Sequence, residues 1–271
     1  MTLTPQQLAQ YCHRIGYDGP LSPTLATLRA LHELHPRAIP FENLDPWLGL
    51  PVSLEPEALF DKLVRQCRGG YCFEQNGLFA LVLQTLGFSI TGLSARVLWN
   101  QLPGAQPART HRALLVAAQG QDWLVDVGFG GLTALAPLRL VAEREQRTPL
   151  ETLRLRASYS GWILQVLLPQ GERPVYWFNG ESANPADFEL SNWYVSTHPQ
   201  SRFVQHLICS AVHGTARHNL LDRSHTIYRP GQPPQTRLLE HPDELSALLG
   251  DVFVPASANL PHLGTALQRL F

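Results

Sequence analysis

The sequence predicts an α+β fold, with a helical first third followed by a part that is rich in strands. In the first third, apolar residues recur at helical spacing, as Leu25, Leu28, Leu31 and Leu34 show. From Ser89 onward, short runs of β-branched and aromatic residues alternate with turn residues, which is typical of strands. We therefore expect a helical bundle that leads into a small sheet or barrel.

Helix boundaries follow from capping residues and prolines. Thr4-Pro5 and Ser22-Pro23 each combine an N-cap residue with proline at the first helical position. Pro36 is expected to end the second helix, because proline cannot continue the hydrogen-bond ladder. The other expected helices span residues 55–66, 72–86, 185–195 and 243–249.

The expected strands are short and are separated by turn residues. They span residues 94–99, 113–118, 123–127, 153–159, 162–168, 175–178, 203–212, 215–220, 226–228 and 237–239. No internal repeat is visible. The length suits one large domain or two to three small ones. The pattern changes from helical to strand-like after residue 88, and a further helical stretch begins at residue 185, so the expected parts of the chain are 1–88, 89–184 and 185–271.

The composition is that of a globular protein with a sizeable core. Of the 271 residues, 44% are hydrophobic and 16% are charged, which excludes a disordered or fibrous protein. The formal net charge is −1, and no block of like charge stands out. Nucleic acids and anionic membranes bind clustered cationic residues, so neither is expected as the main partner.

Cysteine usage and the N-terminus indicate a cytoplasmic protein. Met1 is not followed by a basic region and then an apolar one, so no signal peptide is expected. No run approaches the roughly 20 apolar residues of a membrane span. The cysteines show no C-x-x-C pair and no disulfide framework; they are Cys12, Cys67, Cys72 and Cys209. No cluster of His, Cys, Asp and Glu has the spacing of metal ligands, so no metal is expected.

Cys72 follows a Gly-Gly turn and stands where a helix is expected to begin. Gly69 and Gly70 permit a tight turn. A thiol at a helix N-terminus meets the positive end of the helix dipole, which favours the reactive thiolate. The alternative is a small buried hydrophobic residue, the usual fate of a free cysteine. This segment alone leaves both interpretations open.

His111 and Asp126 flank an expected hairpin. A turn centred on Gln119-Gly120 makes them diagonal neighbours, and a turn centred one residue earlier makes them directly opposite. In both registers they share a face, at roughly 5 to 8 Å between Cβ atoms. A shift of the turn centre by half a residue would put them on opposite faces.

These three residue types suit nucleophilic catalysis. Asp126 would fix the tautomer of His111, and His111 would take the proton of Cys72. The alternatives are an ordinary strand-end histidine, one of 11 in the chain, and a turn aspartate. A carboxylate inside the apolar run 124–127 is costly without a partner, which favours a triad.

Several segments together resemble the arylamine N-acetyltransferase family. They are Arg68-Gly-Gly-Tyr-Cys-Phe-Glu, Thr110-His111, Asp126-Val-Gly-Phe-Gly-Gly, Ile39-Pro-Phe-Glu-Asn-Leu44 and Asn192-Trp-Tyr-Val-Ser-Thr-His-Pro-Gln-Ser-Arg-Phe203. The cysteine, histidine and aspartate follow one another at spacings of 39 and 15 residues. The resemblance runs from about residue 39 to 204, and the chain length fits the shorter bacterial members.

The resemblance implies a fold and an activity. The implied fold has a helical bundle with the nucleophile, a β-barrel with His111 and Asp126, and an interdomain helix with an α/β lid. The triad would be arranged as in cysteine proteases and transglutaminases. The implied activity is ping-pong acetyl transfer from acetyl-coenzyme A through Cys72 to arylamines and arylhydrazines, as in xenobiotic metabolism. N-hydroxyarylamines are a further candidate acceptor.

Other residues are candidates for binding. The family adds that the loop containing Gly130 and Gly131 borders the acceptor and coenzyme A site, although a plain β-turn is the alternative. Phe129 is a candidate wall of the amine pocket. Thr110 and Phe73 complete the set, the latter through a backbone N–H that would hold the oxyanion.

Arg68 and Glu42 are expected to form a buried ion pair with a structural role. Two rival interpretations of the whole chain stay open. A cysteine hydrolase or transglutaminase-like amide-forming enzyme would share the triad but need a peptide groove and no coenzyme A. A non-catalytic binding module is the other, and the intact triad argues against it.

Overall fold

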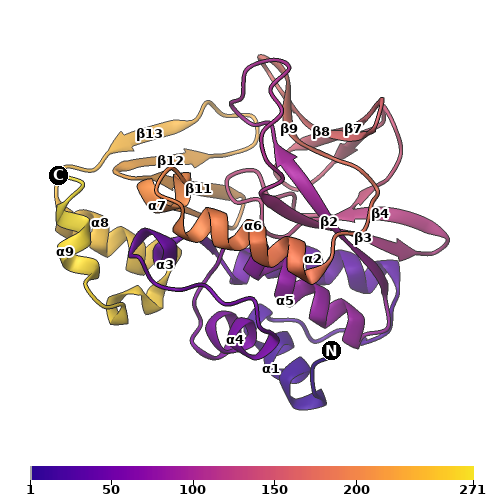
Figure 1. Cartoon of the computed structure of the whole chain (residues 1–271), viewed down its shortest axis with the longest axis horizontal. Coiled ribbons are helices and arrows are strands. Elements are labelled where there is room, and N and C mark those ends of the chain that lie inside the picture. The colour runs from indigo at the N-terminus through magenta and orange to yellow at the C-terminus, as the bar shows by residue number, and fades with distance from the viewer. Residues whose placement is uncertain (1) are drawn as a thin grey trace.

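The computed structural model describes residues 2–271, and the first third is helical as expected (Figure 1). The long helices α1, α2 and α5 enclose a core that also takes in apolar residues of the following hairpin, such as Leu114 and Val116. A five-residue π-helix, Asp61–Arg65, continues α4. The helices here are α1 (Pro5–Ile15), α2 (Leu25–Ala38), α3 (Leu44–Trp47), α4 (Pro56–Phe60) and α5 (Cys72–Thr85).

Two expected boundaries of α2 are wrong. The helix begins after Thr24 rather than after Ser22, because the Thr24 hydroxyl accepts the N–H of Thr27 at 3.2 Å. It also continues through Pro36. Pro36 lies in the last turn, where a missing N–H removes one bond only, and the N–H of Ile39 still reaches His35 at 2.8 Å. By contrast, Thr4 caps α1 as predicted.

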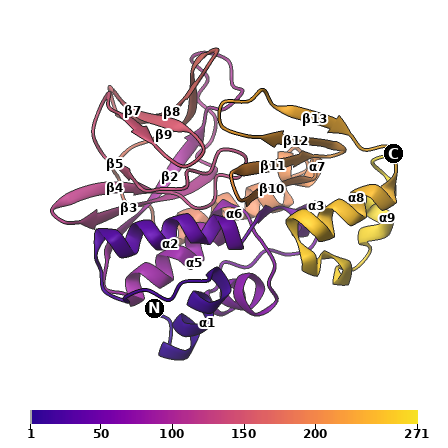
Figure 2. The same ribbon diagram turned by 180° about the vertical axis from the view of Figure 1, so that it is seen from behind.

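The middle of the chain forms one eight-stranded antiparallel sheet in the order β5-β4-β3-β2-β9-β8-β7-β6. It curls into a nearly closed, barrel-like shape (Figures 1 and 2). A parallel bridge from Ala142 to Leu155 ties the segment after β5 back to β7. The strands are β2 (Ser89–Val97), β3 (His111–Ala118), β4 (Gln121–Val125), β5 (Leu138–Arg139), β6 (Glu145–Arg147), β7 (Thr152–Ser158), β8 (Gly161–Leu168) and β9 (Gly171–Phe178).

The last third combines a second antiparallel sheet, in the order β1-β10-β11-β12-β13, with short helices beside it (Figure 2). Its core includes Leu207, Leu220 and Phe253. Helix α6 (Pro185–Thr197) leads into this part. The remaining elements are β1 (Phe41–Glu42), α7 (Arg202–Gln205), β10 (Ile208–His213), β11 (Ala216–Leu221), β12 (Ser224–Tyr228), β13 (Gln235–Leu238), α8 (Pro242–Leu248), a π-helix (Leu249–Phe253), a 3₁₀-helix (Pro255–Asn259) and α9 (Leu263–Gln268).

The α+β fold class is confirmed, and most predicted strands lie within a few residues of observed ones. The start of the predicted strand 203–212 is wrong, because residues 202–205 form α7. Ser201 caps that turn by accepting the N–H of Phe203 at 3.2 Å. The domain boundaries at 88 and 184 stay a prediction. Strand β1 of the first third pairs with β10 of the last, so these two parts of the chain share one sheet.

Among the helices of the described residues, none is both long and apolar enough to cross a bilayer.

Candidate active site

Cys72 is the first residue of α5 and is buried. The turn before it needs glycine, because a Cβ on Gly69 would collide with the carbonyl of Pro40. The N–H of Tyr71 donates to the carboxylate of Glu74 at 3.0 Å, which fixes the first turn of the helix. The sequence therefore delivers a thiol to the N-terminus of a buried helix, as predicted.

His111 and Asp126 come together at the open end of the β3–β4 hairpin. The hairpin pairs Ala118 with Gln121, so its turn is centred on Gln119-Gly120. In this register the two residues are diagonal neighbours, and His111 Nε2 lies 2.7 Å from Asp126 Oδ2. Both side chains are buried, at 3% and 5% exposure. The expected juxtaposition of imidazole and carboxylate is present.

The electrostatics of this pair favour the charged forms. Burial disfavours the imidazolium of His111, but the charge of Asp126 and its hydrogen bond outweigh burial, with smaller contributions from Cys72. Together they raise the pKa of His111 to about 10. Burial likewise opposes the Asp126 carboxylate, yet the charge of His111 and the hydrogen bonds that Asp126 accepts lower its pKa. Both shifts favour an imidazolium beside a carboxylate.

The Cys72 thiol lies beside this pair. Its Sγ is 3.8 Å from the carbonyl oxygen of Thr110, the residue before His111. Asp126 occupies Nε2 of His111, so Nδ1 is the ring nitrogen left to exchange a proton with the thiol. The predicted residue Thr110 thus contacts the Cys72 sulfur through its backbone.

Asp126 has partners that the sequence analysis did not identify. Its Oδ1 accepts the side-chain amide of Asn76 at 2.9 Å and the N–H of Gly128 at 3.0 Å. Its own N–H donates to Nε2 of His32 at 3.2 Å. Burial lowers the pKa of His32 to about 4, which keeps that ring neutral and able to accept. A polar residue four positions after Cys72 in an apolar helix was the one available signal for Asn76.

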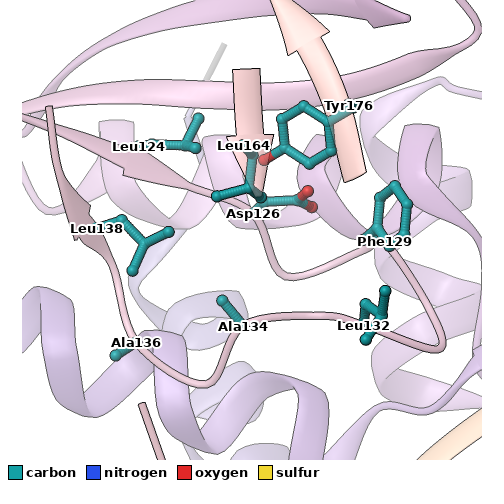
Figure 3. A pocket seen from close by; sticks show the side chains of 9 residues that line it. All are labelled: Leu124, Asp126, Phe129, Leu132, Ala134, Ala136, Leu138, Leu164 and Tyr176. Atoms are coloured by element: carbon teal, nitrogen blue, oxygen red, sulfur yellow. The ribbon is translucent and has the colours of Figure 1, made fainter. Parts of the chain in front are cut away.

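Aromatic rings surround His111. Its ring centroid is 4.9 Å from that of Tyr176 and 5.2 Å from that of Phe129. Tyr176, Phe129 and Asp126 line a small cavity (Figure 3), and its volume of about 10 Å³ is room for about one water molecule.

The other predicted binding residues are held by contacts within the fold, and their part in binding stays a prediction. The carbonyl of Gly131 accepts from Arg217 and Asn219 of β11, and Gly130 adopts a left-handed φ of 87°. The side chain of Phe73 is buried. Its backbone N–H is among the first of α5, which have no acceptor inside the helix.

The predicted ion pair of Arg68 and Glu42 is confirmed, with 2.8 Å between Nη2 and Oε1. This pair belongs to a larger buried network of ion pairs beside the first turn of α5. Arg68 also binds Asp45 at 2.6 Å, and Lys62 binds both Asp45 and Glu74, at 2.7 and 2.6 Å. Because Glu74 also accepts from Tyr71, the network anchors the turn that carries Cys72.

Among the described residues, no group of three or more His, Cys, Asp and Glu side chains is arranged to hold a metal ion.

Comparisons with known proteins identify a family. A family model described as N-acetyltransferase matches residues 24–257. The arylamine N-acetyltransferase of Mycolicibacterium smegmatis is 45% identical over 246 residues, which cover 89% of this chain and 90% of that protein. The arylamine N-acetyltransferase of Escherichia coli is 38% identical over 247 residues, which cover 91% and 88%.

Solved structures agree with this. The structure of Mycobacterium marinum arylamine N-acetyltransferase in complex with CoA superposes with a TM-score of 0.92 at 41% identity, over 97% of this chain and 98% of that one. The arylamine N-acetyltransferase from Salmonella typhimurium gives 0.90 at 34% identity, over 100% and 98%. Sequence and fold together show that this chain belongs to the arylamine N-acetyltransferase family of acyltransferases.

Proposed function

We propose that the chain transfers an acetyl group from acetyl-coenzyme A to arylamines and arylhydrazines through an acetyl-Cys72 thioester. The observation that carries the proposal is the buried His111–Asp126 pair, 2.7 Å apart, beside a thiol at the start of α5. The coenzyme complex of the Mycobacterium marinum relative supports the choice of donor. A relative from Salmonella typhimurium is named an N-hydroxyarylamine O-acetyltransferase as well, which supports N-hydroxyarylamines as further acceptors.

Before the first half-reaction the Cys72 proton passes to Nδ1 of His111, and the Cys72 thiolate then attacks the acetyl carbonyl carbon. The C–S bond to coenzyme A breaks, and the departing thiolate takes a proton from the imidazolium of His111. Asp126 holds the ring by Nε2 throughout, so that Nδ1 faces the reacting sulfur atoms. Free coenzyme A and acetyl-Cys72 result.

In the second half-reaction the amine nitrogen attacks the thioester carbonyl carbon. Neutral His111 accepts the proton that the nitrogen loses, the C–S bond to Cys72 breaks, and an amide leaves. The thiolate and imidazolium are thereby restored. The backbone N–H of Phe73, one of the unpaired amides at the start of α5, is suited to hold the oxyanion of both tetrahedral intermediates.

The surroundings of Cys72 are also suited to protect a thioester from hydrolysis. The sulfur is buried, and the rings of Phe129 and Tyr176 cover the side of His111. We place the reaction in the cytoplasm, with foreign aromatic amines as acceptors. The four cysteines are all free thiols, which is consistent with a reducing compartment. The proposed steps require no metal.

Steady-state kinetics test the ping-pong order. We expect parallel double-reciprocal plots when acetyl-coenzyme A is varied at several fixed aniline concentrations. Intersecting plots would mean direct transfer in a ternary complex. Discharge of the acetyl-enzyme to water or to a lysine of a peptide, but not to aniline, would favour the hydrolase or transglutaminase-like alternative.

A further inference from the structure

Asn76 connects the nucleophile helix to the aspartate. It lies on α5 one turn after Cys72 and is fully buried, at 0% exposure. Its Nδ2 donates to Asp126 Oδ1 at 2.9 Å, and its Oδ1 accepts the N–H of Val127 at 3.0 Å. One side chain therefore holds both the carboxylate of Asp126 and the backbone that follows it.

The same amide also reaches the histidine strand. Nδ2 of Asn76 donates its second hydrogen to the carbonyl of Arg112, the residue after His111, at 2.7 Å. Cys72 begins α5, His111 begins β3, and Asp126 directly follows β4. Asn76, which lies on α5, is hydrogen-bonded both to β3 and to Asp126.

These bonds fix the orientation of the amide. Both hydrogens of Nδ2 point at oxygens that can only accept, and the Oδ1 faces a backbone N–H that can only donate. A flip of the amide would place donor against donor at Val127 and acceptor against acceptor at Asp126. Asn76 therefore satisfies all three hydrogen bonds in one orientation only, and this fixes its separation from Asp126 and from β3.

We propose that Asn76 is a positioning residue that sets the distance and orientation among Cys72, His111 and Asp126. The proposal rests on the function proposed above, since it assigns Asn76 a part in the same reaction. Asn76 does not touch the reacting atoms; it acts through Asp126 and through the backbone of β3.

Loss of this amide has two physical consequences. The Asp126 carboxylate keeps only the bonds of His111 and Gly128 and can rotate away from the ring. The pKa of Asp126 rises, because one of the donors that lower it is gone. His32 and Tyr176, the other titratable groups that face this carboxylate, are untouched by the change.

The test compares Asn76→Leu, which keeps the volume and removes all three bonds, with wild type. The first half-reaction is followed as the rate of coenzyme A release in a single turnover without amine, from pH 4 to pH 9. We expect release to be about 10- to 100-fold slower, taking as a guide the order seen when hydrogen-bond partners of metal ligands are removed. The acetyl-coenzyme A concentration that gives half the maximal release rate should change by no more than about twofold. The acid limb of the pH profile, where the rate falls on the low-pH side, should move to higher pH.

The matched control is Gln75→Leu, the neighbouring buried amide of α5. The side-chain bonds of Gln75 go to His35 and to the carbonyls of Ile39, Pro40 and Gly70. Its loss costs stability without shifting the acid limb. A second variant, Asn76→Asp, keeps an acceptor for Val127 but as a carboxylate cannot donate, and should be at least as slow as Asn76→Leu. The melting temperature of each variant confirms that it is folded.

Two outcomes overturn the proposal. One is a release rate within about twofold of wild type in both folded Asn76 variants. The other is a slow release whose acid limb matches that of Gln75→Leu, which would make Asn76 merely structural. If wild type itself gives no burst, the proposed function fails instead. The rate of Cys72 alkylation by iodoacetamide at pH 7.5 then decides the role of Asn76, and we expect it to be about tenfold slower in Asn76→Leu.

Discussion

His111 Nε2 and Asp126 Oδ2 lie 2.7 Å apart, and both side chains are almost fully buried. In such a place the carboxylate has little water to solvate it, so its hydrogen-bond partners decide its charge and direction. The carboxylate of Asp126 is held by His111 of β3, by Asn76 of α5 and by the backbone N–H of Gly128, so its geometry depends on the packing of separate elements.

Asp126→Asn should abolish most turnover in a folded protein. The amide offers His111 a group that favours the wrong tautomer, and it can no longer stabilise the imidazolium. In the serine-protease triad the equivalent change costs about 10⁴-fold in turnover, and we expect a loss of that order here. The measurement is kcat with a saturating aromatic amine. A well-folded variant with near wild-type kcat would remove Asp126 from the site.

The raised pKa of His111 predicts a specific dependence of stability on pH. Its value is about 10 in the folded protein, against an ordinary 6.5. The imidazolium therefore stabilises the folded state, fully below about pH 6.5, and this contribution disappears as pH rises through about 10. Urea unfolding of wild type and His111→Gln should show a stability difference that shrinks over this interval. A difference that is constant with pH would contradict the charged pair.

Cys72 should be the one thiol that activity requires. Cys72→Ala is expected to fold and to show no transfer, because no other group is placed to form the thioester. Cys12→Ala, Cys67→Ala and Cys209→Ala should retain most activity, since these three thiols lie outside the site. Initial rates of the four variants decide it; more than trace turnover by Cys72→Ala is incompatible with the mechanism.

Lys62 should be far more important for stability than its neighbour Arg65. Lys62 binds Asp45 and Glu74, whose side chains are only 8% and 1% exposed. Lys62→Met leaves the buried Glu74 without its cation and Asp45 with Arg68 alone, and breaking a buried pair in this way typically costs about 3–5 kcal/mol. The matched control is Arg65→Met, whose ion pairs are exposed and which should change the melting temperature little. Similar melting temperatures for the two variants would argue against the network.

The sequence was informative where one local signal sufficed. The glycine turn before Cys72 and the hairpin turn at Gln119-Gly120 each located a candidate catalytic residue, because helix starts and hairpin registers depend on a few neighbouring residues. Pro36 misled the analysis, since the cost of a proline depends on where in the helix it lies.

Partners that are distant in sequence were beyond that kind of inference. Asn76 looks like a polar residue in an apolar helix until α5 is packed against β3 and β4. In the sequence Lys62 resembles a surface lysine, and only the fold brings the buried carboxylate of Glu74 into contact with it. In both cases the burial that makes the contact matter is created by the tertiary fold.

The central claim is the covalent intermediate, and mass spectrometry tests it most directly. The enzyme is mixed with acetyl-coenzyme A without any amine, quenched, and examined as intact protein and as peptides. The mechanism predicts the mass of one acetyl group per chain, located on Cys72 and removed by a chase with aniline. An unmodified Cys72 in an enzyme that still acetylates aniline under the same conditions would contradict it.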